Sequence, residues 1–223
     1  MTGELLQREQ YAKGGMGRWY WDYLDQRTLS YIGEERDILD LGCGEGITLE
    51  KILCRFPDRN VLGIDYEEEK VRICKKHHLP ARQGSAYTLD LEDHSRDCCL
   101  LLEVIEHLSD PQKALREVHR VLRDGGRFVV LEFGLPTDPL VGRLYLRYFR
   151  RILPAVGRLI SSHPRAYSYL RDSVTEFPPP GAITDALEAC GFSARAPVRL
   201  TRGIVYLYVA QKVAGGVSGP SGL

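Results

Sequence analysis

The stretch Ile38–Gly46, which reads ILDLGCGEG, decides the fold of this 223-residue chain. Its first four residues are apolar apart from one acid, as is typical of a buried parallel strand. Glycines then occupy alternate positions, and apolar residues at helical spacing follow. These are Leu49, Ile52, Leu53 and Phe56. A strand, a glycine turn and a helix in this order bring backbone close to a ligand at a helix N-terminus, so the stretch predicts a cofactor site.

Strand-like and helix-like segments alternate after this unit. The predicted strands cover residues 60–65, 98–102 and 127–133, and residues 81–86 are expected to form a short strand and its turn. A helix beginning at Ser109-Asp110-Pro111 is expected to include Leu122 and to stop at Gly125-Gly126. A last helix precedes two strand-like runs at 195–200 and 203–212, which predict an antiparallel pair. The alternation predicts an α/β fold with a doubly wound, mostly parallel sheet, a helical insert and an antiparallel C-terminal strand pair.

The composition favours one enlarged domain over residues 1–213, because 43% of the residues are hydrophobic. Residues 1–35 are expected to form an arm and a helix, with residues 1–17 mobile. Residues 135–180 are expected to form the helical insert on the substrate side, and the small, polar residues 214–223 a disordered tail. No signal peptide and no run of eighteen apolar residues is found, which predicts a cytoplasmic protein. Six cysteines without metal-ligand spacing predict reduced thiols and no metal.

The net charge of zero conceals a basic segment. Between Pro139 and Arg171 the chain has no Asp, Glu or Lys, and it has arginine at 143, 147, 150, 151, 158, 165 and 171. Three interpretations stay open: a surface that meets anionic lipid at the inner face of the membrane, a solvated basic face, and a lid paired with the acidic remainder. No nucleic-acid partner is expected, because the segment lacks a nucleic-acid-binding motif.

The glycine spacing and two acids narrow the predicted cofactor. The turn has the pattern G-x-G-x-G, whereas a nicotinamide fingerprint has G-x-G-x-x-G. Asp40, just before the turn, suits a ligand that carries an ammonium group and no pyrophosphate. Asp65 ends the second predicted strand, close to the spacing at which a carboxylate accepts from the ribose hydroxyls of an adenosine ligand.

At these motifs the sequence resembles the class I S-adenosylmethionine-dependent methyltransferases over about residues 36–134. ILDLGCGEG resembles that family's first motif, Ile64-Asp65 its second, and EVIEHL (103–108) the segment after the fourth strand. Ser85 stands where the family's adenine contact usually has an acid. The resemblance implies S-adenosyl-L-methionine as cofactor and S-adenosyl-L-homocysteine as product. The implied cofactor-binding residues are Asp40, Gly42, Cys43, Gly44, Gly46, Asp65, Tyr66, Ser85, Ala86 and Glu103.

The last third of the chain resembles a narrower group, the ubiquinone/menaquinone-biosynthesis C-methyltransferases. The similar segments are LEFGLP (131–136), RAYSYLRDSVTEFP (165–178), GF (191–192) and LTRGIVYLYVAQK (200–212). This resemblance implies methyl transfer to a ring carbon of a prenylated quinol. The chain lacks the group's N-terminal Tyr-Asp-x-Met-Asn, has LRDGG (122–126) where Leu-Lys-Pro-Gly-Gly is usual, and has EVIEHL in place of Phe-Gly-Leu-Arg-Asn.

Alternatives therefore stay open for the acceptor. EVIEHL favours an O- or N-methyltransferase of a soluble metabolite; a non-catalytic methyltransferase-fold partner subunit and, more distantly, a nicotinamide oxidoreductase are further alternatives. His107 is the candidate general base, because it follows the fourth strand and its ordinary pKa lies near working pH. Tyr11, His163 and Tyr206 are weaker candidates for the substrate pocket. The sequence does not indicate an oligomeric state.

Overall fold

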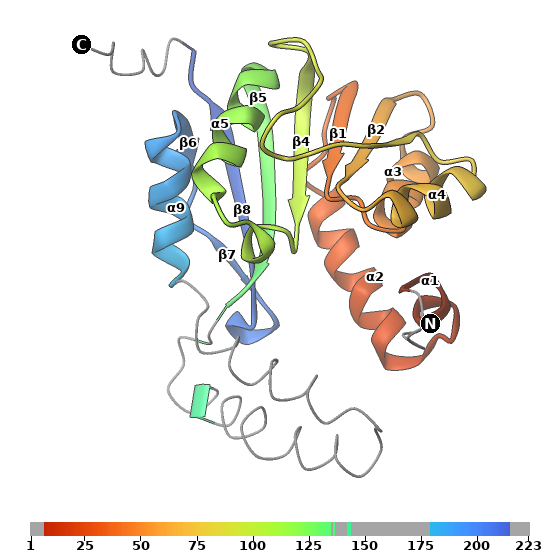
Figure 1. Cartoon of the computed structure of the whole chain (residues 1–223). Coiled ribbons are helices and arrows are strands. Elements are labelled where there is room, and N and C mark those ends of the chain that lie inside the picture. Colours follow the sequence, from red (N-terminus) through yellow and green to blue (C-terminus); the bar gives the residue numbers. More distant parts are fainter. Residues whose placement is uncertain (1–6, 135, 137–141, 144–178, 215–223) are drawn as a thin grey trace.

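The computed structural model describes residues 7–134, 136, 142–143 and 179–214. Its centre is an eight-stranded sheet with the order β3-β2-β1-β4-β5-β8-β6, in which β7 also pairs with β8 (Figure 1). The strands are β1 (Asp37–Leu41), β2 (Asn60–Asp65), β3 (Ala81–Gln83), β4 (Arg96–Leu102), β5 (Leu122–Phe133), β6 (Phe192–Ala194), β7 (Val198–Leu200) and β8 (Val205–Lys212). Strands β1 to β5 pair in parallel, and β8 is antiparallel to β5, β6 and β7. The predicted doubly wound α/β fold is confirmed.

Helices cover both faces of this sheet (Figure 1). They are α1 (Gln7–Ala12), α2 (Gly15–Leu29), α3 (Ile47–Arg55), α4 (Glu68–Lys76), η1 (Ile105–His107), α5 (Pro111–Val121), α9 (Pro180–Ala189) and η3 (Thr201–Gly203). Apolar residues of α2, α3 and α4 pack with one face of the sheet, and those of α5 and α9 pack with the other. The adjacent residues Cys98 and Cys99 belong to opposite cores, as strand alternation requires. All six cysteines are free thiols, as predicted.

The expectation of a mobile N-terminal arm is wrong for residues 7–17. Helix α1 contacts the glycine turn, and α2 begins at Gly15. The two side-chain oxygens of Glu45 accept hydrogen bonds from the N–H groups of Gln7 (2.9 Å) and Arg8 (2.8 Å). Because the first N–H groups of a helix have no partner within it, this buried carboxylate supplies the acceptors that α1 needs.

The predicted end of the fifth helix is also wrong. Helix α5 ends at Val121, and Leu122 is extended, is fully buried and pairs with Arg96 as the first residue of β5. The Leu122 carbonyl accepts a hydrogen bond of 2.9 Å from the Lys212 ammonium, a contact across 90 residues that no local pattern indicates. Most of the predicted insert (135–180), with His163 and six of its seven arginines, lies outside the described residues, as does 215–223 of the predicted tail.

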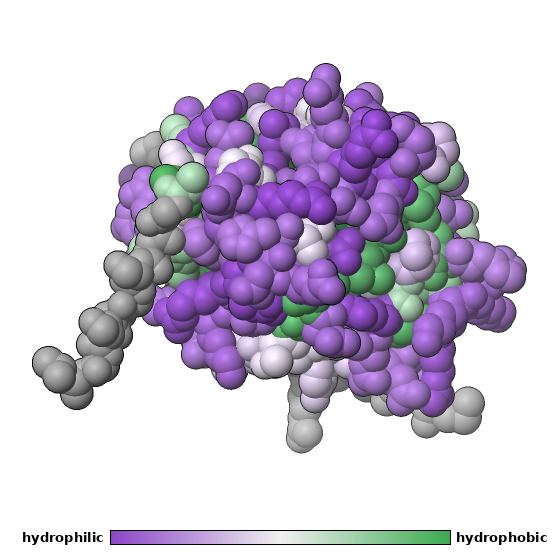
Figure 2. Space-filling model, turned by 90° about the horizontal axis from the view of Figure 1, so that it is seen from above, coloured by the Kyte–Doolittle hydropathy of each residue, from purple (hydrophilic) through white to green (hydrophobic). Residues whose placement is uncertain are grey.

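The amino-terminal edge of the parallel strands is closed by charged groups. Arg123 pairs with Asp37 at 2.8 Å and also with Asp97, whose Oδ2 accepts from the N–H groups of Arg36 and Asp37. The surface seen from above, where this edge lies, is largely hydrophilic (Figure 2). Ligands of doubly wound sheets bind at the opposite, carboxyl edge, where the strand order reverses; here this point lies between β1 and β4. Within the described ranges, no helix is long and apolar enough to cross a bilayer.

Candidate active site

The glycine turn between β1 and α3 is tied to the neighbouring strand β2. The N–H groups of Gly42 and Cys43 both donate to the Ile64 carbonyl, at 2.7 and 3.2 Å. The Gly44 N–H donates to Oδ2 of Asp65 at 2.8 Å. Positive φ angles at Gly42 (80°) and Gly44 (54°) let the chain fold back on itself within these few residues. The turn is therefore fixed before any ligand binds.

Asp65 ends β2 beside this turn, where the sequence predicted a ribose-binding carboxylate. Its Oδ1 accepts from the Glu67 N–H at 2.9 Å, so each carboxylate oxygen has one amide partner. A carboxylate oxygen accepts two hydrogen bonds, which leaves capacity for two hydroxyl donors. The Asp65 side chain thus anchors the turn and keeps free acceptor capacity of the kind a diol requires. Tyr66, which follows it, is 77% exposed, so its ring can stack on a planar group of a ligand.

Asp40 lies at the same edge on β1 and is 2% exposed. Its Oδ2 is buried and has no hydrogen-bond partner among the described residues. Burial, together with the charges of Asp25 and Asp65, raises the pKa of this carboxyl to about 7. A buried acid without a partner is costly unless a cation approaches it, so this position is prepared for a positively charged group.

Asp25, on α2, joins this acidic group, although no sequence pattern singled it out. Helix α2 crosses the carboxyl edge of the sheet and buries Asp25 to 7% exposure. Lys51 pairs with its Oδ2, and the Thr48 hydroxyl donates to its Oδ1 at 3.0 Å. Burial nonetheless raises the Asp25 pKa.

Ser85 and Ala86 follow β3 on the far side of Asp65. The Gly84 N–H donates to the Asp65 carbonyl at 3.0 Å, which brings the predicted adenine-side residues next to the predicted ribose carboxylate. Ser85 Oγ accepts from the Tyr87 N–H at 3.2 Å, and the hydroxyl proton remains available for donation. Ala86 packs on the core, so its contribution to a ligand is limited to backbone and a methyl group.

The segment after β4 lies at the same edge. Glu103 has a positive φ of 58°, and its N–H donates to the Leu131 carbonyl at 2.8 Å. The buried Glu132, on β5, holds the next turn, since its Oε1 accepts from the N–H groups of Val104 (3.0 Å) and Ile105 (2.7 Å). Sequence reasoning missed this role; the signal was an acid within the apolar run of β5. The side chain of His107 is 70% exposed, and its Nε2 lies 3.5 Å from Oε1 of Glu106.

The predicted substrate residues are dispersed. The Tyr11 hydroxyl donates to Asp22, and the Lys51 ammonium lies 4.6 Å from the Tyr11 ring centroid. Tyr206 is buried in β8, where its ring fits against Gly134. His163 lies outside the described residues. Contacts among the described residues therefore do not bring the three together.

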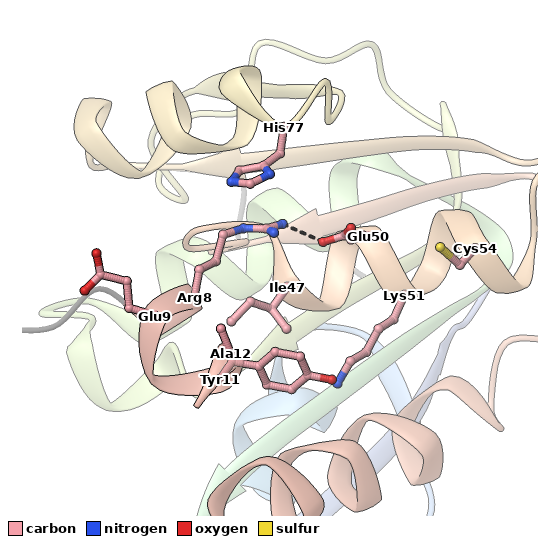
Figure 3. A pocket seen from close by; sticks show the side chains of 9 residues that line it. All are labelled: Arg8, Glu9, Tyr11, Ala12, Ile47, Glu50, Lys51, Cys54 and His77. Atoms are coloured by element: carbon pink, nitrogen blue, oxygen red, sulfur yellow. Dashed lines mark hydrogen bonds and ion pairs between the residues drawn. The ribbon is translucent and has the colours of Figure 1, made fainter. Parts of the chain in front are cut away.

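A cavity of about 530 Å³ lies between α1 and α3, and its lining does not include Asp25, Asp40 or Asp65 (Figure 3). The Arg8 guanidinium crosses one side of it and pairs with Glu50 at 2.8 Å. The same guanidinium donates to the carbonyls of Glu45 (2.8 Å) and Gly46 (3.2 Å), so the cavity and the glycine turn share one wall. The lining residues are Arg8, Glu9, Tyr11, Ala12, Ile47, Glu50, Lys51, Cys54 and His77.

Solved structures with a similar fold show the class of proteins to which this fold belongs. A methyltransferase dependent on S-adenosylmethionine (SAM) from Aquifex aeolicus is 18% identical, with a TM-score of 0.61 over 85% of this chain and 89% of that chain. Human N-acetylserotonin methyltransferase in complex with SAM is 19% identical, with a TM-score of 0.61 over 87% of this chain and 53% of that one. The fold is that of the SAM-dependent methyltransferases.

The family follows from the sequence comparisons. The model of the ubiE/COQ5 methyltransferase family matches residues 20–212. A ubiquinone/menaquinone biosynthesis C-methyltransferase of Syntrophotalea carbinolica is 38% identical over 84% of this chain and 81% of its own length. A demethylmenaquinone methyltransferase of Thermus thermophilus is 36% identical over 78% of this chain and 82% of its own length. The chain belongs to the ubiE/COQ5 methyltransferase family and is a SAM-dependent methyltransferase.

The residues at the carboxyl edge fit this cofactor. SAM carries a sulfonium and an ammonium, and Asp40 Oδ2 and Glu103 Oε1 are buried acceptors without a partner in the described part of the chain. No basic residue other than Lys51 pairs with the buried acids of α2, β1 and β2, as far as the structure describes them. The edge is therefore electrostatically suited to a cation.

Binding of SAM is expected to depend on pH through Asp40. A cation favours the ionised carboxylate, so affinity should rise with pH up to about 7, where Asp40 ionises in the free protein, and then level off. Below pH 7 the slope should approach tenfold per pH unit, with proton release on binding. Calorimetry at pH 6 in buffers of different ionisation enthalpy measures that release.

The variant Asp40→Asn should bind SAM more weakly at pH 8 and lose the pH slope, whereas the exposed Asp185→Asn should behave as the parent protein. The effect of pH on the stability of the free protein is opposite to its effect on SAM affinity. Because the folded pKa of Asp40 lies above its unfolded value of 3.8, this group destabilises the free protein increasingly as pH rises from about 4 to 7. Asp40→Asn should therefore raise the free energy of unfolding at pH 8, by up to about 4 kcal/mol, because one pKa unit corresponds to about 1.4 kcal/mol. If SAM affinity in Asp40→Asn kept the pH slope of the parent protein, Asp40 would not be the group that titrates on SAM binding.

Proposed function

We propose that this enzyme transfers the methyl group of SAM to a ring carbon of a prenylated hydroquinone. The observation that carries the proposal is the family match over residues 20–212, which extends through the insert to the last strand. Relatives that match most of this chain bear the names demethylmenaquinone methyltransferase and ubiquinone/menaquinone biosynthesis C-methyltransferase. The domain is proposed to comprise residues 1–213, with the insert on the acceptor side.

In this proposal one group of residues at the carboxyl edge binds the adenosine part of SAM, and another lies beside its methionine part. Asp65 accepts from the ribose hydroxyls, and Ser85 and Ala86 lie along the adenine. Backbone of Gly42, Cys43 and Gly44 runs beside the methionine part, with the Asp40 carboxylate opposite its positive charge. SAM supplies an electrophilic methyl group on sulfur. The protein contributes orientation of the acceptor carbon in line with that bond, and it excludes water from the site.

Methyl transfer to oxygen or nitrogen of a soluble metabolite is the second candidate. The segment Glu103–Leu108 supports it, because it stands in place of the Phe-Gly-Leu-Arg-Asn of the C-methyltransferase group and carries three ionisable side chains, Glu103, Glu106 and His107. A ring hydroxyl must lose its proton before the neighbouring carbon attacks, so acids and a histidine at this position also suit C-methylation.

Incubation with methyl-labelled SAM and a borohydride-reduced membrane lipid extract tests the proposal. We expect the label in the lipid phase, on a product 14 mass units heavier than a prenylated quinol, and stable to acid that cleaves methyl ethers. Label in a water-soluble ether or amine would instead support the second candidate. A heat-treated sample is the control.

The basic insert is proposed to meet the membrane in which such an acceptor resides. Seven arginines and no acid between Pro139 and Arg171 support this, because a basic and apolar segment binds anionic lipid. The same labelling reaction, with the extract incorporated in anionic or in neutral vesicles, should run faster with the anionic ones at low salt. Equal rates in both would contradict membrane contact through the insert.

A further inference from the structure

Glu103 differs from the other acids at the carboxyl edge. It is the first residue after β4, and its backbone has a positive φ of 58°, which is uncommon for a residue other than glycine and costs on the order of 1 kcal/mol. Its Oε1 is inaccessible to solvent and has no hydrogen-bond partner among the described residues. A strained backbone that buries an unsatisfied carboxylate oxygen contributes nothing to stability, so a role toward a ligand is indicated.

The groups that face Glu103 come from three elements. Asp25 and Tyr20 lie on α2, Glu106 on η1 and Glu132 on β5. Asp25 is held by Lys51 and Thr48, and Glu132 by two backbone N–H groups. Glu106 has the His107 imidazole at 3.5 Å. The Glu103 carboxyl, whose Oε1 has no partner in the described part of the chain, thus lies between Asp25 and η1 at this edge.

Its surroundings also make it basic. Burial, together with the charges of Glu106 and Asp25, raises the pKa of Glu103 to about 8. A carboxylate with a pKa in this range is a much stronger proton acceptor than an exposed glutamate, and it is half ionised at about pH 8.

We propose that Glu103 is the catalytic base that accepts the proton of the acceptor's ring hydroxyl. The proposal rests on the proposed function, since it assigns one proton transfer within that reaction. The exposed His107, which the sequence favoured for this task, is left as a solvent-facing neighbour of Glu106.

The step balances without a further reactant. The hydroxyl proton moves to the Glu103 carboxylate, and the electron pair of the O–H bond delocalises into the ring. The neighbouring ring carbon forms a bond to the methyl carbon, the methyl–sulfur bond breaks, and its electron pair stays on sulfur, which becomes neutral. The methylated carbon then loses its hydrogen as a proton, the ring is aromatic again, and Glu103 returns the hydroxyl proton to the ring oxygen. The net release is one proton.

The variant Glu103→Gln tests the proposal, because it keeps the shape and removes the base. We expect kcat to fall about 100-fold, the lower bound of typical general-base contributions. The acidic limb of the kcat–pH profile should disappear, and the SAM dissociation constant should rise by far less than the turnover falls. An acceptor with a halogenated, more acidic ring hydroxyl should restore most of the lost turnover. The exposed Glu188→Gln is the matched control, and His107→Ala should retain the acidic limb.

A readout independent of turnover is the titration of Glu103 itself. In protein with ¹³C-labelled glutamate carboxyl carbons, the resonance that is missing from Glu103→Gln should titrate near pH 8. Parent-like kcat and pH profile in Glu103→Gln would overturn the proposal, as would a loss of SAM affinity that matches the loss of turnover. The identity of the parent protein's product tests the proposed function separately, and the variants test Glu103 on whichever acceptor that assay identifies.

Discussion

Replacing Asp65 with alanine is expected to weaken SAM binding on the order of 100-fold. The variant loses the ribose acceptor, and it also releases the Gly44 and Glu67 N–H groups, which the carboxylate holds at 2.8 and 2.9 Å. Hydrogen bonds to a charged group contribute about 1.5–3 kcal/mol each, and about 1.4 kcal/mol corresponds to tenfold in affinity. Losing a ligand contact and the anchor of the turn together accounts for the expected size.

Titration calorimetry measures this effect, and two variants interpret it. Asp58→Ala removes an exposed aspartate near the start of β2 and should leave the affinity unchanged. Asp65→Asn keeps one oxygen but directs an NH₂ group at an N–H donor, so it should also bind poorly. Parent-like affinity in Asp65→Ala would exclude the ribose assignment.

Replacing Gly42 with alanine should be strongly destabilising. A Cβ at this position would lie 2.3 Å from Cγ2 of Val104, and the backbone φ of 80° is unfavourable for any residue with a Cβ. Overpacking and the left-handed backbone together are expected to cost about 3 kcal/mol, which corresponds to a melting temperature lower by roughly 6–12 °C. SAM affinity should fall as well, because Val104 connects the turn to the segment after β4.

Thermal and urea unfolding of four variants separate the two contributions. Gly42→Ala combined with Val104→Ala should recover the overlap cost but retain the backbone cost of about 1 kcal/mol, so the double-mutant cycle should give a favourable coupling energy. Gly181→Ala, in α9, is the matched control because a Cβ there meets no atom within 4 Å. A Gly42→Ala protein as stable as the parent would contradict the prediction, because it would show that the turn adjusts to a Cβ without measurable cost.

Local patterns predicted the parts of the molecule that depend on neighbours in sequence. Alternating segments gave β1 to β4 and the helices between them, because each buries one periodic face. The position of Asp65 beside the glycine turn followed from the parallel pairing of the first two strands. The boundary between α5 and β5 was missed, since an apolar residue such as Leu122 fits either element and a distant partner, Lys212, decides it.

The acids that complete the site could not be selected from the sequence for the same reason. Glu45 serves α1 across 38 residues, and Glu132 serves the turn after β4 across 28 and 27 residues. Asp25 enters the site because α2 crosses the sheet edge. Each acts on groups distant in sequence, where no spacing rule applies. In sequence, they are ordinary acids on a helix, in a turn and in a strand.

The central claim is that SAM binds at the carboxyl edge of the sheet, over the glycine turn, and not in the cavity between α1 and α3. Hydrogen–deuterium exchange with and without SAM tests this most directly. The account predicts slower exchange in peptides covering residues 41–47, 63–67 and 84–87. Protection restricted to peptides from α1 and the second half of α3, which line the cavity, would contradict it.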